Sequence, residues 1–398
     1  MKYLRILLLA LFSVGVTQLG NAQIAVKAEL IYTSAGDPIE NGVVLIKDGK
    51  IDRVGTESRV RIPGDYTVYE AKVVTPGLID AHTVVGLAGY LNQPHDQDQI
   101  ETSSAIQPEL RAIDAYNALE PLVGHLRNNG VTTIHTGHGP GALISGQTMI
   151  VKTSATTVDE GVLHPSKMLA FTLGNMMNSG IRTPGTRSKG IAMLRQNLVK
   201  AQTYLDKRNS DNPAVKDLGM DALADLLEGK LTAMVTVHKA NDIMTALRLQ
   251  EEFGFPMVLD GVAEAYLVLD EIKESGIPVF IHPPMLRASG EAKNATMTLA
   301  VKLHESGIPF AFQSGFEGYV PKTRVILFEA AVAVAQGLEY EAAVDALTIE
   351  SAKLLGIDGQ VGSIERGKDA DLVLYDGDPF EYLTHVTHVI INGELVTE

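Results

Sequence analysis

Apolar residues alternate with polar ones in short runs at both ends of the chain. These β-type runs span residues 25–32, 42–46, 370–375 and 386–391. An Asp-Gly pair at 48–49 follows the second run, and an Asn-Gly pair at 392–393 follows the last. Such pairs between apolar flanks predict tight hairpin turns. The pattern therefore predicts one small sheet domain that is built from both ends of the chain.

Strand-like and helix-like segments alternate between these ends. The strand-like segments are residues 73–82, 131–137, 148–153, 167–173, 231–238, 256–261, 278–282 and 309–313, and helical periodicity occurs at 242–253, 264–274, 292–304 and 324–336. This alternation is typical of parallel strands joined by right-handed helical crossovers. Eight strands predict an α/β fold with a closed, TIM-like (β/α)8 barrel. An open doubly wound sheet is the alternative, although no Gly-rich nucleotide fingerprint follows any of these strands.

The first 22 residues carry a different pattern. Lys2 and Arg5 precede a short apolar run at 6–16, and small residues stand at 20–22. A positive start, a short apolar run and small residues before a cut are the parts of a secretory signal. We expect a signal peptide at 1–22, export to a bacterial periplasm and no membrane attachment after cleavage. The alternative is an uncleaved anchor, for which the apolar run is short.

The rest of the chain is expected to form two domains. The two end segments, 23–75 and 356–398, are expected to combine as a small composite β-sandwich domain. The barrel is expected to occupy 76–355. This division suits a chain of 398 residues, which is long enough for one large domain and one small one.

Composition and charge exclude several classes of protein. Apolar residues make up 45% of the chain and charged residues 20%, as in ordinary globular proteins. Asp and Glu outnumber Lys and Arg by 48 to 33, so the chain lacks the positive charge that would neutralise nucleic acid phosphates. There is no Cys, which excludes disulfides, thiolate nucleophiles and Cys-ligated zinc.

Candidate chemical groups stand where the barrel strands end, which is where reactive groups gather in such folds. The candidates are His82, His238, Asp260 and His282. Each has a structural alternative. An imidazole can simply hydrogen-bond across the barrel mouth, and Asp260 can cap the helix that follows it.

A second cluster of candidates follows the strand at 131–137. His135 and His138 flank a Gly-rich turn, and we expect both to contribute to substrate binding together with His282. The turn glycines could present backbone N–H groups to a carboxylate or another anion. The alternative is a tight turn whose glycines serve only a positive φ.

Two motifs resemble those of a known family. Residues 76–82 (Pro-Gly-Leu-Ile-Asp-Ala-His) resemble the first-strand motif of the amidohydrolase superfamily, and 362–372 is similar to its carboxyl-terminal return segment. The most similar members are imidazolonepropionase-like and prolidase-like. The resemblance covers nearly all of the chain after the signal. It implies a metal-dependent hydrolase of carbon–nitrogen bonds, in which divalent metal polarises the scissile carbonyl and lowers the pKa of bound water.

The resemblance also implies a set of metal ligands, and this chain keeps only part of it. His82 matches the first His of strand 1, and His238 matches the His that ends strand 5. Val84 replaces the second His of strand 1, and Asp260 stands where the strand-6 His is expected.

Two further positions of the implied set have also changed. Ser314 or Gly315 occupies the place of the strand-8 Asp, which would shuttle protons. Asn175 lies in a segment that resembles one carrying Glu. A dinuclear centre therefore cannot be assembled.

Three hypotheses follow for the function. The first is a single divalent metal, most simply zinc, held by His82, His238 and Asp260, with His238 and Asp260 also catalytic. The second is metal-free chemistry with His82 or His238 as general base. The third is a catalytically inactive barrel that binds a ligand or acts as a scaffold. The expected partner is a small amide-like molecule, and association of identical chains is open.

Overall fold

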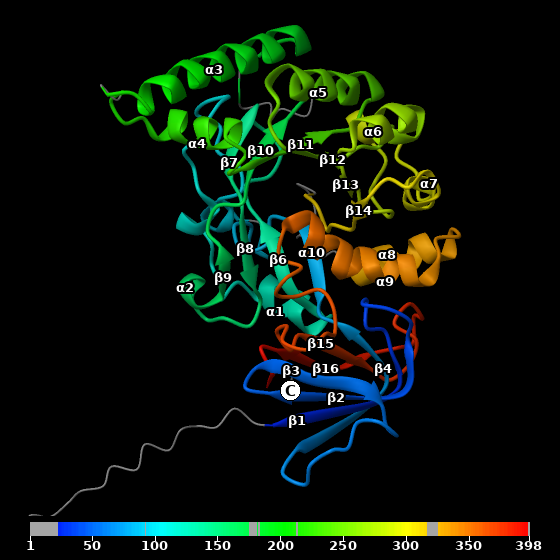
Figure 1. Cartoon of the computed structure of the whole chain (residues 1–398). Coiled ribbons are helices and arrows are strands. Elements are labelled where there is room, and N and C mark those ends of the chain that lie inside the picture. Colours follow the sequence, from blue (N-terminus) through cyan, green and yellow to red (C-terminus); the bar gives the residue numbers. More distant parts are fainter. Residues whose placement is uncertain are drawn as a thin grey trace, which may run out of the picture.

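The protein is described here by a computed structural model (Figure 1). It describes residues 23–396 except 92, 175–180, 182–183, 212–213 and 317–324. The signal peptide expected at 1–22 lies outside the described residues. Among those residues, no helix combines the length and the apolar character needed to cross a membrane.

A seven-stranded sheet combines the two ends of the chain (Figure 1). Its strands, in spatial order, are β17 (Glu394–Leu395), β16 (Val386–Ile391), β15 (Leu372–Tyr375), β4 (Thr67–Pro76), β1 (Ile24–Ile31), β2 (Ile39–Lys47) and β3 (Lys50–Thr56). β4 pairs in parallel with β1 and antiparallel with β15. Strands from the carboxyl end therefore lie directly against those from the amino end, as the apolar pattern predicts. The domain boundaries at 75 and 355 stay predictions.

Both predicted hairpin turns are present in this sheet. Asp48 and Gly49 have φ angles of 52° and 78°, and Asn392 and Gly393 have 53° and 75°. Two successive positive φ angles give the turn type that matches the twist of the flanking strands. Asn, Asp and Gly adopt this conformation at the lowest cost, which explains why these residues stand there.

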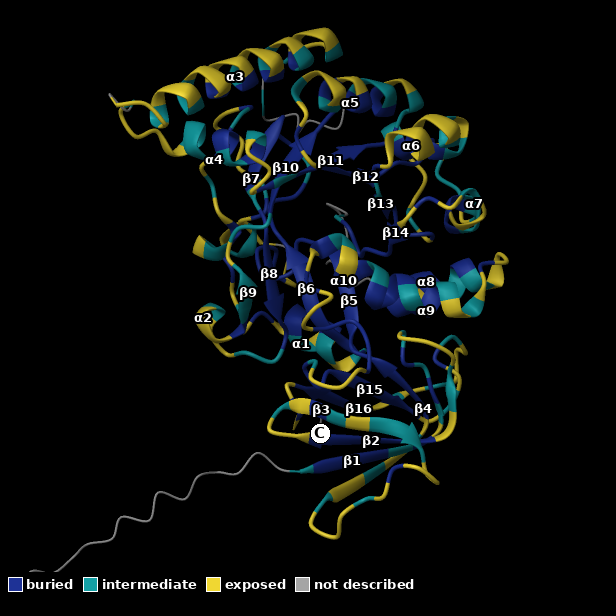
Figure 2. Cartoon of the chain, in the orientation of Figure 1, coloured by how far each residue is buried: buried dark blue, intermediate teal, exposed yellow. Residues whose placement is uncertain are grey.

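The barrel strands form two further sheets. The first has the order β5 (Leu78–Thr83), β6 (Val131–Thr136), β8 (Met149–Lys152) and β9 (Val162–His164). The second has the order β14 (Phe310–Ala311), β13 (Val279–Ile281), β12 (Met257–Gly261), β11 (Thr232–Val237), β10 (Met168–Thr172) and β7 (Ile144–Gln147). β10 to β14 are all parallel, as predicted. In Figure 2 these strands are buried along almost their whole length.

Hydrogen bonds link the two sheets on both sides. The backbone N–H of Ala81 on β5 donates to the carbonyl of Phe312 over 3.1 Å, just after β14. On the other side, the N–H of Thr148 donates to the carbonyl of Met168 over 2.8 Å. The strands thus surround one interior, although no closed barrel of eight parallel strands is present in the described residues. The expectation of a closed barrel fails at 148–153, because the chain reverses after β6 and β8 runs antiparallel to it.

The single strand predicted at 73–82 is two strands that belong to different sheets. β4 ends at Pro76 and β5 begins at Leu78. At Gly77 between them, a Cβ atom would lie 2.2 Å from Oγ1 of Thr132. Glycine therefore allows the chain to pass closely against β6 as it leaves the composite sheet for the barrel.

Helices cover the outside of the barrel strands. They are α1 (Pro121–Asn128), α2 (Val158–Gly161), α3 (Arg187–Arg208), α4 (Leu218–Leu227), α5 (Ala240–Phe253), α6 (Leu269–Ser275), α7 (Leu299–Ser306), α8 (Ile326–Ala335), α9 (Tyr340–Leu347) and α10 (Ile349–Leu355). Four of them, α5 to α8, correspond to the helices predicted from periodicity, with α6 and α7 shorter than predicted. In Figure 1, α3 and α5 lie at the end of the molecule farthest from the composite sheet.

A buried cluster of charges joins the barrel to the composite sheet. The Nζ atom of Lys152, at the end of β8, lies 2.6 Å from Oδ2 of Asp369 and 3.1 Å from Oδ2 of Asp371. It also donates to the side-chain oxygen of Asn392. Both carboxylates belong to the return segment at 362–372 that carries the family resemblance. That segment therefore has a structural task here, which is to hold the barrel against the sheet.

Candidate functional site

The centre of the candidate site is a hydrogen-bonded pair of side chains from β5 and β12. Nδ1 of His82 lies 3.1 Å from Oδ1 of Asp260, and both side chains are buried. A carboxylate can only accept, so Nδ1 of His82 carries the proton and donates it to Asp260. The lone pair of the His82 ring is therefore on Nε2. This atom is buried and has no hydrogen-bond partner within the described residues.

Asp260 is held by two more donors. The hydroxyl of Thr236 donates to Oδ2 over 2.6 Å, and Nε2 of Gln313 donates to Oδ1 over 2.6 Å. Burial works to raise the pKa of Asp260, but the charge and hydrogen bond of His82 and the two other donors outweigh burial and lower it. Asp260 is thus an ionised carboxylate directed into the barrel, and these contacts leave it no role as the cap of the following helix.

The charge on Asp260 acts back on His82. Burial alone would lower the pKa of His82, because it disfavours the charged imidazolium. The carboxylate of Asp260 and its hydrogen bond more than offset this and raise the pKa of His82 above its ordinary value. The pair can therefore take up a proton at Nε2 and keep it while Asp260 balances the charge.

Asp80 positions the backbone around His82. Its Oδ1 accepts from the backbone N–H of Ser314 over 3.0 Å and from that of His82 over 3.3 Å. Its Oδ2 has no partner within the described residues, and burial raises the pKa of Asp80 to about 7. Ser314, one of the two residues expected at the place of the strand-8 Asp, donates its hydroxyl to Oγ1 of Thr83 over 2.9 Å.

The two remaining strand-end histidines, His238 and His282, follow the strands on either side of β12, which carries Asp260, and they lie close enough to interact. Burial, helped by the neighbouring His282, lowers the pKa of His238 to about 4, although Asp260 opposes this shift. Nδ1 of His282 donates to the carbonyl of Pro283 over 2.8 Å, and its Nε2 is buried with no partner in the described part of the chain. Both imidazoles are therefore neutral near pH 7.

The ring of His238 rests directly on Gly261. Gly261 has a φ of 84°, and a Cβ atom there would lie 2.6 Å from Cε1 of His238. We expect Gly261→Ala to lower the free energy of unfolding by about 1–3 kcal/mol, because the new methyl group overpacks the site and the backbone is strained. Chemical denaturation would measure this loss.

Gly254→Ala is the matched control for that substitution. Gly254 also has a positive φ, 73°, but a Cβ atom there would meet nothing within 4 Å. Its cost should reflect backbone strain alone. Equal losses in the two variants would contradict a contact between residue 261 and His238.

The two histidines predicted to bind substrate on β6 and after it are placed differently. Nδ1 of His135 donates to the carbonyl of Ala81 over 2.7 Å, and its Nε2 lies 2.6 Å from Oγ1 of Thr148. Both ring nitrogens are thus engaged inside the fold, and neither is left for a ligand. His138 is also buried, and its Nδ1 has no partner within the described residues. Within the described part of the chain, no hydrogen bond or ion pair joins it to His82 or Asp260.

These buried neutral histidines predict loss of stability in acid. Burial lowers the pKa of His135 to about 3 and that of His138 to about 4. The unfolded chain, with ordinary values near 6.5, binds more protons, so stability falls as the pH drops below about 6.5. Each histidine should remove about 2 kcal/mol of unfolding free energy between pH 7 and pH 5.

Denaturation curves at pH 7 and pH 5 would measure this effect. Asp80 works in the opposite direction, because its raised pKa favours the protonated native state in acid. The comparison is therefore made with His135→Gln, which removes a single titrating group. Its pH dependence should be shallower than that of the parent protein. Parallel curves would contradict the low pKa of His135.

Comparison with known proteins agrees with this architecture. The sequence model of the amidohydrolase family matches residues 73–396. The chain belongs to the amidohydrolase family. This accounts for the first-strand motif at 76–82, for the return segment at 362–372 and for the sheet that the two ends share.

Individual relatives are similar to this amidohydrolase at low identity. Amidohydrolase tasK of Hapsidospora irregularis is 25% identical over 88% of the chain, which spans only 39% of the length of tasK. An imidazolonepropionase of Brucella anthropi is 24% identical over 85% of the chain and 87% of its own length. Among solved structures, an amidohydrolase from Thermotoga maritima MSB8 superposes with a TM-score of 0.88 at 28% identity, over 94% of this chain and 100% of that one.

These relationships set the class of activity and of fold. Family membership and the imidazolonepropionase relatives support a hydrolase that acts on carbon–nitrogen bonds. The solved relatives imply a TIM-like barrel with an added β domain. Members of the superfamily typically use metals, so the family also supports a metal cofactor.

The donor atoms of this amidohydrolase do not fit the predicted metal site. A zinc centre needs three protein ligands, and the described residues contain no group of three His, Cys, Asp or Glu side chains placed to hold a metal ion. The predicted ligands were His82, His238 and Asp260. His82 and Asp260 are instead hydrogen-bonded to each other, and both carboxylate oxygens of Asp260 accept hydrogen bonds from protein side chains. Asn175, the changed position near strand 4, lies outside the described residues.

Two residues of the site were not recognised from sequence as functional candidates. Gln313 and Thr236 bind Asp260, yet neither is acidic, basic or a usual metal ligand. A signal was present, because both occupy inward positions near the ends of strands at the same rim. Their role follows from the structure, in which both donate hydrogen bonds to the buried carboxylate of Asp260.

Proposed function

We propose that this amidohydrolase hydrolyses the carbon–nitrogen bond of a small amide or cyclic amide, with His82 as general base. The observation that carries this proposal is the buried Nε2 of His82, which lacks a partner while Nδ1 is bonded to the ionised Asp260. This is the arrangement of an imidazole held in one tautomer by a carboxylate, and it supports acid–base catalysis.

The proposed reaction needs one water molecule and one proton carrier. Nε2 of His82 takes a proton from water, and the resulting hydroxide attacks the carbonyl carbon of the amide. The carbon–nitrogen bond then breaks, and the imidazolium of His82 returns its proton to the departing nitrogen. Asp260 balances the imidazolium charge while the proton is on His82, and the buried site excludes competing water.

The relatives suggest the type of amide. The curated relatives of similar length are named imidazolonepropionases, which favours a cyclic amide or imide-like ring as the substrate. A ring also suits a single base, because the attacked carbon and the departing nitrogen stay in one molecule close to His82. No step of the proposal passes through a metal, since the described donors do not form a metal-binding group.

A second candidate function is binding without turnover. Val84 stands at a position where the resemblance implies a metal ligand and offers no side-chain donor atom, and Ser314 or Gly315 stands where the resemblance implies an Asp. A barrel that has lost these groups could bind an amide-like molecule and leave it intact. The two candidates differ in one observable, the appearance of a hydrolysed product.

A panel of substrates separates the two functions. Purified protein, residues 23–398, is incubated with hydantoin, dihydrouracil, an imidazolone and N-acyl amino acids, with and without a chelator, and products are measured by mass spectrometry. We expect one cyclic amide to be hydrolysed at a rate that survives chelation. Hydrolysis that disappears with the chelator and returns with zinc would replace the His82 proposal by the metal one. Saturable binding without product would establish the second function.

A further inference from the structure

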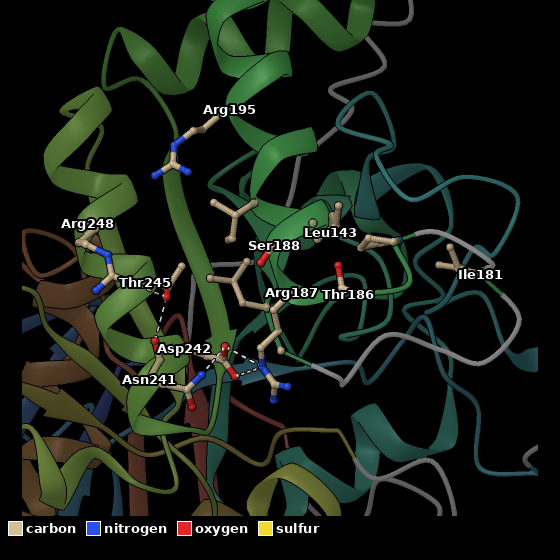
Figure 3. A pocket seen from close by; sticks show the side chains of 15 residues that line it. Leu143, Ile181, Thr186, Arg187, Ser188, Arg195, Asn241, Asp242, Thr245 and Arg248 are labelled. Atoms are coloured by element: carbon tan, nitrogen blue, oxygen red, sulfur yellow. Dashed lines mark hydrogen bonds and ion pairs between the residues drawn. The ribbon is translucent and has the colours of Figure 1, made fainter.

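A cavity of about 600 Å³ lies between the first turns of α3 and α5 (Figure 3). Its floor includes Leu173 and Gly174, which directly follow β10, and Leu143, which precedes β7. A volume of this size holds a small organic molecule. None of the lining residues is a member of the His82–Asp260 pair or one of its partners. The cavity therefore lies near the rim of the barrel and is separate from the candidate active site at His82 and Asp260.

The lining contains more arginines than carboxylates. The lining includes three arginines, Arg187, Arg195 and Arg248, and a single carboxylate, that of Asp242. This balance is the reverse of that in the whole chain, where acidic residues outnumber basic ones by 48 to 33. Carboxylates pair with Arg187 and Arg195, so Arg248 is the arginine whose charge favours an anion that enters the cavity.

Two of the three arginines form ion pairs with carboxylates, and these pairs hold their side chains in place at the cavity wall. Nε of Arg187 donates to both oxygens of Asp242 over 2.9 Å, as the dashed lines in Figure 3 show, and its Nη2 donates to Glu291 over 2.9 Å. Nε of Arg195 donates to Glu252 over 2.7 Å. The first pair neutralises the one carboxylate of the lining, so Asp242 does not repel an incoming anion.

Arg248 is the available cation. Its Nη2 donates to Oγ1 of Thr245 over 2.8 Å, within the same helix, and within the described residues it makes no ion pair. In Figure 3, Arg195 comes from α3 and Arg248 from α5, so the two guanidinium groups approach the cavity from different helices. α3 also begins here, and the positive end of its dipole adds to the same potential.

The rest of the lining is apolar or uncharged. Leu143, Leu173 and Ile191 supply apolar side chains, while Ser188 and Thr186 supply hydroxyl groups. A ligand matched to this lining has one anionic group for the guanidinium side and a short apolar body for the leucine side. A guanidinium recognises a carboxylate through two parallel hydrogen bonds, which makes a carboxylate the fitting anion.

We propose that the cavity between α3 and α5 binds a small organic acid, with its carboxylate at Arg248 and its apolar body against Leu143, Leu173 and Ile191. The site is independent of hydrolysis at His82. Its ligand is bound and released unchanged, since the cavity contributes no general base of its own.

Isothermal titration calorimetry with two probes tests this site. The probes are 4-methylpentanoate and the uncharged 4-methylpentan-1-ol, neither of which contains a carbon–nitrogen bond that the protein could hydrolyse. We expect one equivalent of the acid to bind, and the alcohol to bind at least tenfold more weakly. Absence of binding at millimolar concentration, or equal affinity for both probes, would overturn the proposal.

Three variants locate the bound acid. Arg248→Gln should weaken binding of 4-methylpentanoate at least tenfold, whereas Arg53→Gln, an exposed arginine on β3, should leave it unchanged. His82→Ala should also leave it unchanged. Unaltered binding in Arg248→Gln, or lost binding in His82→Ala, would place the acid elsewhere and overturn the proposal without touching the proposed hydrolysis. Melting curves confirm that each variant is folded, which is expected because Arg248 is exposed and hydrogen-bonds to Thr245 of its own helix.

Discussion

His82→Ala is expected to lower kcat/KM for the hydrolysed amide by about 10²–10⁴-fold, which is the usual contribution of a positioned general base. The substitution removes Nε2, the buried atom without a partner that is proposed to take the proton from water. Steady-state kinetics on the substrate found in the panel measure the loss. Added imidazole should restore part of the activity, because it can enter the space that the ring leaves. An unchanged rate in His82→Ala would remove this residue from the reaction.

Controls separate catalysis from folding. His304→Ala removes a half-exposed histidine on α7 that pairs with Glu339 over 3.4 Å, so it should leave the rate unchanged. Asp260→Asn keeps the size of the side chain but removes the charge that raises the pKa of His82. Activity should fall in acid as His82 becomes protonated. In Asp260→Asn this fall should move to lower pH, a shift that a purely structural role of Asp260 would not produce.

Lys152→Met is expected to lower the free energy of unfolding by about 3–5 kcal/mol, because it leaves the buried carboxylate of Asp371 without its cation, whereas Asp369 keeps its ion pair with Lys50. Lys152 is 3% exposed and lies within 3.1 Å of both Asp369 and Asp371. Burial raises the pKa of Asp371 despite the attraction of Lys152, so loss of this cation would leave its charge uncompensated. Denaturant-induced unfolding at neutral pH measures the effect.

Lys353→Met is the matched control for this prediction. Lys353 pairs with Glu350 on the surface of α10, with 51% of its side chain exposed, and such pairs contribute about 0–1 kcal/mol. Adding Asp371→Asn to Lys152→Met should recover part of the lost stability, because it removes the stranded charge. A loss in Lys152→Met as small as that in Lys353→Met would show that water replaces the lysine at little cost.

Sequence periodicity predicted most of the fold but not where one strand becomes two. The alternating runs at both ends and the parallel strands β10 to β14 lie close to where they were expected. The run at 73–82 is apolar on both sides of Pro76 and Gly77, and this Pro-Gly pair is the one local signal of a break between β4 and β5. The separation depends on the approach of Gly77 to Thr132, a contact between segments far apart in sequence. Local pattern carries no information about such contacts.

The candidate site was predicted in position more accurately than in chemistry. Strand-end reasoning located His82 and Asp260 at one rim, and the structure places them 3.1 Å apart. The expected role as joint metal ligands depended on the direction in which each side chain points and on what else binds it. Gln313 and Thr236 occupy the oxygens of Asp260, and neither contact can be read from spacing alone.

The order of strands in the composite sheet has a consequence for how the chain is made. β4 is complete once residue 76 has been synthesised, but its neighbour β15 begins only at Leu372. During synthesis, the edge of β4 that will pair with β15 therefore stays unpaired until almost all of the remaining chain has been translated. Exposed edges of this kind invite pairing with other chains. We expect truncated chains that end before β15 to aggregate, and the newly made protein to depend on chaperones until its last strands emerge.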